Sequence, residues 1–122
     1  MGLFKKELSF EKIELSKSKI DSDKSAIIKV NVKNSKEKFD NLVLKIKTDD
    51  ASNQYVTISN SVIQLPPLDF PDKNTGEQEI TIIPHNIPLS TMSFKIGVEV
   101  FANDKEKPLL QKEFNLTIKK KN

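Results

Sequence analysis

Alternation of apolar and polar residues dominates this chain of 122 residues. In residues 28–32 and 94–100, every second side chain is apolar. A period of two is typical of β-strands that bury one face and expose the other. No stretch of ten or more residues keeps the 3.6-residue apolar stripe of an amphipathic helix. The pattern therefore predicts an all-β chain, with strands at residues 7–15, 26–33, 40–48, 54–59, 61–65, 77–83, 92–102 and 109–119.

The first predicted strand breaks its own alternation. Leu8 and Phe10 share one parity, whereas Ile13 and Leu15 share the other. A β-bulge inserts one extra residue and turns the side chains that follow it to the other face. The conflict therefore predicts a bulge near Glu11-Lys12, where the first strand of a two-sheet sandwich often passes from one sheet to the other.

Polar or proline-containing segments separate the predicted strands, as turns do. Seven or eight short antiparallel strands within one domain predict an immunoglobulin-like β-sandwich. We expect it to occupy residues 7–119, with a basic tail at 1–6 and another at 120–122. Since the chain has no cysteine and no tryptophan, aliphatic packing must hold this sandwich without the disulfide of antibody domains.

Composition excludes several kinds of chemistry. All 20 basic residues are lysine, there is one histidine, and the three glycines are scattered. The chain therefore lacks a thiol nucleophile, a cysteine zinc site, a glycine-rich phosphate loop and the bidentate guanidinium of arginine. We expect a protein that is not an enzyme and that needs no cofactor.

Charge is unevenly distributed along the chain. Residues 1–38 carry ten lysines and six acidic residues, residues 39–90 carry three and seven, and residues 91–122 carry seven and four. Because the first and last strands of an immunoglobulin-like sandwich are neighbours, the molecule is expected to have a basic side and an acidic side. Two interpretations fit: a charged partner or head-to-tail self-association, or solvated strand faces with lysines that protect strand edges.

Two adjacent segments carry a resemblance to known modules. In residues 24–34, Val30, Val32 and Asn34 form a V-x-V-x-N pattern, and Leu42, Leu44 and Ile46 form an alternating apolar pattern in residues 39–47. This region resembles the CARDB/NEW3-type immunoglobulin-like modules that are common in prokaryotes. It is also similar to the major-sperm-protein domain. The resemblance implies a binding or scaffolding role without chemistry, in a prokaryotic protein.

Two sets of residues are candidates for a chemical site, one catalytic and one for calcium. His85, with Ser90 or Asp72 as partner, is a candidate base, but no nucleophile elbow accompanies it. Calcium needs several converging oxygen ligands, and a calcium- or membrane-responsive sandwich of C2 type is the alternative function. The candidate acidic residues would gather at one end (Asp21, Asp23, Asp49 and Asp50) or at the other (Asp40, Asp69, Asp72, Asp104 and Glu106).

The basic ends of the chain are candidates for contact with anionic surfaces. Leu3 and Phe4 stand beside Lys5-Lys6, so weak membrane contact fits the sequence, as does a solubilising tail. Nucleic acid is not an expected partner, because stacking aromatics are few. No apolar run exceeds three residues and no signal region follows Lys6, so we expect a cytoplasmic protein.

A protein partner, or a second copy of the chain, is the expected ligand. Val43 and Phe101 fall on the outward parity of their strands and offer apolar surface. Leu68 and Phe70 lie in the proline-rich segment 65–71, whose stiff backbone lowers the entropy lost on docking. This segment is either a recognition loop or a cap that folds Leu68 and Phe70 over the open end of the core.

Overall fold

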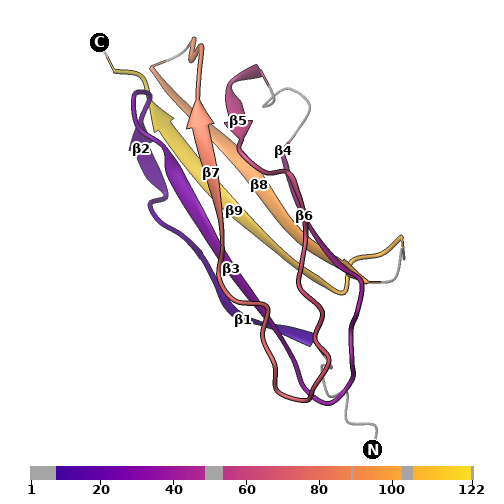
Figure 1. The fold of residues 1–122 in the computed structure, drawn as a ribbon. Helices are drawn as coiled ribbons and strands as arrows, with labels where there is room; N and C mark the ends of the chain where they lie inside the picture. Colours follow the sequence, from indigo (N-terminus) through magenta and orange to yellow (C-terminus); the bar gives the residue numbers. More distant parts are fainter. Residues whose placement is uncertain (1–7, 49–53, 89, 103–105, 122) are drawn as a thin grey trace, which may run out of the picture.

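The alternating segments fold into two packed β-sheets in the computed structural model, which describes residues 8–48, 54–88, 90–102 and 106–121 (Figure 1). Within these residues there are nine strands. One sheet has four, in the order β1 (Leu8–Leu15), β3 (Ala26–Asn34), β7 (Gln78–Pro84) and β5 (Val56–Ile58). The other has five, in the order β2 (Lys19–Asp21), β9 (Leu110–Lys119), β8 (Thr91–Ala102), β4 (Leu42–Thr48) and β6 (Val62–Gln64). The predicted all-β, immunoglobulin-like sandwich is confirmed.

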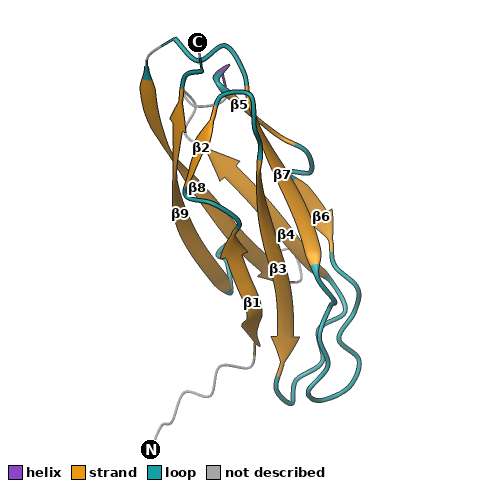
Figure 2. Cartoon of the chain, turned by 90° about the vertical axis from the view of Figure 1, so that its left-hand side faces the viewer, coloured by secondary structure: helices purple, strands orange, loops and turns teal. Residues whose placement is uncertain are grey.

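The two sheets face each other as two layers (Figure 2). The core between them consists mainly of aliphatic side chains. Alternate residues of the regular strands point into it, so strand parity determines most of the side chains that are buried. The central strands β3 and β8 contribute seven side chains with no exposed surface: Ala26, Ile28, Val30, Val32, Ile96, Val98 and Val100. Burial of apolar surface of this kind is the main force that holds the sheets together.

Strand β2 is the element that the sequence pattern did not predict. It has three residues, of which only Ile20 is buried, so it offers no alternation to recognise. It pairs with β9 in parallel, whereas the other strand pairs are antiparallel. The amide of Thr117 donates to the carbonyl of Ser18, and the amide of Ser22 donates to the carbonyl of Lys119, each at 2.8 Å. The first part of the chain is thereby attached to its last strand.

The predicted bulge in the first strand is confirmed. The pairing of β1 with β3 shifts between Phe10 and Lys12, so that Glu11 is the extra residue. Phe10 stands opposite Val32 and Ile13 opposite Val30, which turns both parities of the sequence toward the core. The passage to the other sheet does not occur at the bulge, because β1 stays paired with β3 as far as Leu15.

Most edges of the two sheets are short or interrupted. The edge strands β2, β5 and β6 have three residues each, and β1 carries the bulge. Lys12 on β1 pairs with Glu77 at 3.0 Å and with Glu14 at 3.4 Å. The hydrogen bond between Lys12 and Glu77 raises the pKa of the lysine and lowers the pKa of the carboxyl group. Short edges and edge charges discourage pairing with strands of other chains.

Deletion of Glu11 is expected to be tolerated. Without the extra residue, Phe10 and Ile13 keep their partners on β3 in a continuous register, and all four apolar residues of β1 share one parity. We expect the free energy of unfolding to fall by only about 1 kcal/mol or less, as measured by urea denaturation. Deletion of Lys29 from β3 is the control, because it reverses the parity of half a central strand and should unfold the domain. Equal damage from both deletions would contradict this account of the bulge.

Candidate functional site

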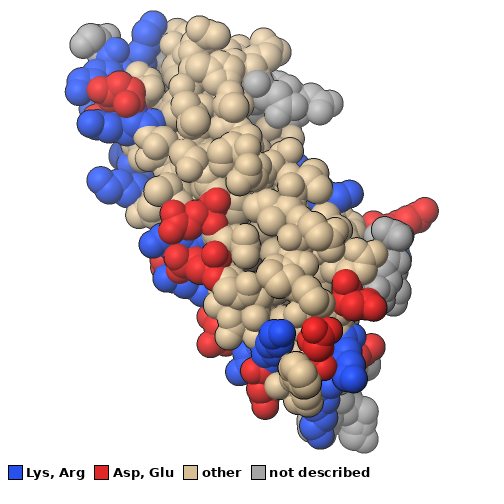
Figure 3. Space-filling view, in the orientation of Figure 1, with Lys and Arg blue, Asp and Glu red and all other residues tan. Residues whose placement is uncertain are grey.

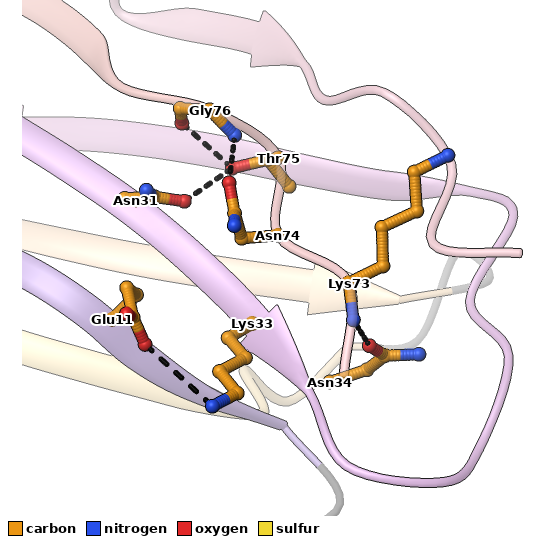
Figure 4. A network of polar contacts seen from close by, with 8 residues as sticks. All are labelled: Glu11, Asn31, Lys33, Asn34, Lys73, Asn74, Thr75 and Gly76. Carbon is orange, nitrogen blue, oxygen red and sulfur yellow. Dashed lines mark hydrogen bonds and ion pairs between the residues drawn. The ribbon is translucent and has the colours of Figure 1, made fainter. Parts of the chain in front are cut away.

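A buried asparagine fixes the loop that follows β6. Asn34 continues the inward parity of β3, and its side chain is 1% exposed. Its Nδ2 donates to the carbonyls of Glu37 and Phe70, both at 2.8 Å. Its Oδ1 accepts from the amide of Lys73 at 2.8 Å, a contact shown in Figure 4. A buried carboxamide is costly unless its donors and acceptors are paired. Asn34 is therefore bound to two loops at once.

The carboxamide of Asn34 joins the two ends of a tight turn. The turn runs from Phe70 to Lys73, with Pro71 and Asp72 at its centre. Proline fits the first central position, and Asp72 has a φ of 55° at the second, a left-handed conformation that aspartate tolerates better than most residues. Because one side chain holds the carbonyl of Phe70 and the amide of Lys73, the turn has a defined shape.

A second anchor stabilises the remainder of the loop. The amide of Val32 donates to Oγ1 of Thr75 at 3.2 Å, and the amide of Thr75 donates to the carbonyl of Val32 at 2.9 Å. The amide of Gly76 donates to Oδ1 of Asn74 at 2.9 Å, and Gly76 has a φ of 82°, which favours glycine (Figure 4). The loop is thus attached to Val32 and Asn34, near the end of β3, before and after the tight turn.

The loop buries one of its large apolar side chains and exposes the other. Leu68 has no exposed surface, and its backbone pairs with that of Phe39 at 3.0 and 2.6 Å. Phe70 is 66% exposed, with Nζ of Lys73 5.6 Å from its ring centroid. Leu68 therefore acts as the cap over the core and presents no side chain to a partner. Phe70 remains available at the surface, and its role in binding stays a prediction.

The other two candidate contact residues lie side by side. Val43 of β4 and Phe101 of β8 are cross-strand neighbours on the outer face of the five-stranded sheet, and both are partly exposed. Nζ of Lys45 lies 4.9 Å from the ring centroid of Phe101. Val62, opposite Lys45 on β6, is 63% exposed and extends the apolar surface. This surface lies at the same end of the sandwich as Phe70, because β4 begins just after Phe39.

The candidate catalytic residues do not come together. His85 follows the end of β7 and Asp72 precedes its start, so the whole strand separates them. The amide of His85 donates to the carbonyl of Tyr55 at 2.8 Å, and this backbone hydrogen bond joins the segment after β7 to the segment before β5. His85 and Asp72 therefore do not form the histidine–aspartate pair that would activate a nucleophile.

The acidic residues likewise form no recognisable metal site. In the part of the chain that the structure describes, no three carboxylate or histidine side chains lie close enough together to hold a metal ion. Asp23 forms an ion pair with Lys121 at 3.2 Å. Asp49, Asp50 and Asp104 lie outside the described residues.

Two features of the site were not predicted from the sequence. The role of Asn34 had a signal, because a polar residue occupies the inward parity directly after Val30 and Val32. The exposure of Val62 had no signal in the sequence, because it depends on which short strand occupies the edge of the sheet.

Comparison with known proteins places the fold. The chain matches no protein-family profile and no curated protein sequence. Among solved structures it is similar to the periplasmic chaperone SfaE, with 12% identity and a TM-score of 0.56, over 91% of this chain and 58% of the chaperone chain. The chain therefore spans less than two thirds of the length of that protein.

The two groups that the sequence resembles are also among the structural neighbours. The CARDB domain of the PF1109 protein from Pyrococcus furiosus has 13% identity and a TM-score of 0.48, over 90% of this chain and 96% of that one. WR4, an MSP family member from C. elegans, has 12% identity and a TM-score of 0.45, over 89% and 97%. At such identities, likeness between structures concerns the fold alone.

Within the described residues, no helix has the length and apolar character needed to cross a membrane.

Replacement of Asn34 by alanine should destabilise the domain. It removes the partners of two carbonyls and one amide, and we expect a loss of about 1–3 kcal/mol in the free energy of unfolding. Urea denaturation measures this loss, and hydrogen exchange at the amide of Lys73 should accelerate. Asn115→Ala is the control, because Asn115 is exposed on β9. If the two variants had equal stability, the role assigned to Asn34 would be wrong.

Alanine substitutions should separate the two large side chains of the loop. Leu68→Ala leaves a cavity at a fully buried position, so we expect it to lower the free energy of unfolding by about 2–5 kcal/mol. Phe70→Ala removes a mostly exposed ring, and the loss should stay near 0.5 kcal/mol. Urea denaturation of both variants tests this. A large loss with Phe70→Ala would mean that this ring, too, belongs to the core.

Proposed function

We propose that this chain is a non-enzymatic protein-interaction module, which binds its partner through Phe70 and the loop that carries it. The observation that carries the proposal is an aromatic ring 66% exposed on a turn that a buried side chain clamps. A single exposed apolar side chain is ordinary on a protein surface, and what distinguishes this ring is the fixed shape of the turn that presents it. Aromatic residues are also enriched among the side chains that dominate binding energy at protein interfaces.

The rigidity of the loop favours binding. Pro71 restricts one φ angle, and Asn34 joins both ends of the turn. A loop that already has its bound shape loses less conformational entropy on association. The neighbouring surface of Val43, Phe101 and Val62 lies at the same end and would enlarge the contact.

Two further observations support binding through this loop: one concerns the sheet edges, and the other is a structural neighbour. Addition of a partner strand requires a long, regular free edge. Three of the four edge strands here have three residues each, and the fourth, β1, is interrupted by its bulge. Similarity in fold to a periplasmic chaperone, over 91% of this chain, also supports an interaction role. The partner is a protein with an apolar pocket for the ring, or a second copy of this chain.

Phe70→Ala should abolish partner capture without unfolding the domain. We expect the tagged wild-type chain to retain a specific protein from extracts of its native host, and the variant to bind that protein, once purified, at least about tenfold more weakly. Calorimetry with the purified partner measures the affinity. If the partner is a second copy, sedimentation should show association of the wild type and a monomeric variant.

Ile83→Ala is the matched control for this experiment. Ile83 is 45% exposed on β7, at the opposite end of the sandwich from Phe70. Its removal takes away a similar exposed apolar group and should leave capture and self-association unchanged. Undiminished capture by Phe70→Ala would refute the proposed site, as would an equal loss in both variants.

A further inference from the structure

A hollow lined by lysines opens where β2, β9 and the turn before β3 meet. Its volume is about 600 Å³, and its lining includes Lys17, Lys19, Lys24, Lys119, Ser16 and Ser25. Figure 3 shows basic side chains gathered at this end of the molecule, at the upper left of the view. We propose that this hollow binds a small anion that carries two or more phosphate groups.

The hollow carries an excess of positive charge. In the described part of the chain, none of its four lysines forms an ion pair, whereas lysines elsewhere do, such as Lys47 with Glu99 at 3.1 Å. One carboxylate, that of Asp21, lies on the wall of the hollow. The excess of like charge around one concave surface creates a positive potential that attracts anions.

A second carboxylate, that of Asp23 beside Lys24 in the chain, has a partner outside the hollow. Asp23 pairs with Lys121 at 3.2 Å, and this hydrogen-bonded contact lowers the pKa of Asp23 below its usual value. Asp23 therefore stays ionised and engaged with a lysine that is not part of the lining. Lys24 of the lining also contributes to the lowered pKa of Asp23, but four lysines against Asp21 and this shared carboxylate leave an excess of positive charge.

The walls of the hollow are held in place by backbone contacts. The amide of Lys24 donates to the carbonyl of Asp21 at 3.0 Å, and the amide of Ser22 donates to the carbonyl of Lys119 at 2.8 Å. The amide of Ile27 donates to Oγ of Ser16 at 2.9 Å, which leaves the hydroxyl proton of Ser16 to be donated. A ligand would thus meet charges and a hydroxyl donor on a backbone that is already ordered.

The chemistry of the lining selects the class of ligand. Lysine binds phosphate as a point charge, and several lysines together match several phosphate groups better than one. The volume falls within the range of small-molecule sites and exceeds that of a single ion. Such phosphate groups occur both on free metabolites and on lipid headgroups, and the experiment must distinguish the two sources.

Tripolyphosphate is a suitable probe for the full chain. In an NMR titration at constant ionic strength, we expect saturable shifts at the amides of residues 16–25 and 119–121. Lys19→Gln with Lys24→Gln should weaken binding by about tenfold or more, because two charge-assisted hydrogen bonds are lost. Lys36→Gln with Lys38→Gln removes the same charge beyond the opposite end of β3 and should leave the affinity within about twofold.

Vesicles identify the source of the phosphate. Flotation with phosphatidylcholine vesicles that contain phosphatidylinositol bisphosphate, blocked by tripolyphosphate, would support the site with a lipid headgroup as ligand. Tripolyphosphate binding without flotation would support it with a free phosphate compound. Shifts that do not saturate, or equal weakening by both double variants, would overturn the proposal. None of these outcomes depends on Phe70, so the proposed protein-binding function stands or falls separately.

Discussion

The carboxamide of Asn34 is the interaction on which the loop end of this sandwich depends. A strand that ends in a buried polar residue must satisfy that residue, and here the partners come from the loops after β3 and after β6. The same side chain therefore ends the strand, joins the turn around Pro71 and sets the position of Phe70. A core residue and a surface residue are linked through one amide group.

Strand parity made most of the fold predictable. The alternation at residues 28–32 and 94–100 placed the central strands of both sheets, and the conflict between Leu8–Phe10 and Ile13–Leu15 located the bulge. Strand β2 was beyond this kind of inference, because three residues with one buried side chain have no period. Its parallel pairing with β9 is a property of the assembled sheets, to which local sequence contributes little.

The loop after β6 shows where the sequence left two roles open. Its prolines predicted a stiff segment, but stiffness does not decide which of Leu68 and Phe70 points inward. Backbone pairing with Phe39 turns Leu68 into the core, and the turn at Pro71 then leaves Phe70 outside. The lysines also have two roles that the sequence did not separate. Several lysines neutralise neighbouring carboxylates, whereas the group around β2 becomes distinct only when the two ends of the described chain meet.

The contact between β2 and β9 also sets the order in which the domain can be completed. Ser22 and Lys121 are hydrogen-bonded although 99 positions separate them in the chain. Contacts between such distant segments carry a large loop-closure entropy and slow the folding of β-sandwiches. The antiparallel pairs β3–β7 and β8–β9 join segments nearer in sequence, so they can form before this contact. We expect β2 to dock last, which would make the five-stranded sheet complete only after the final strand is in place.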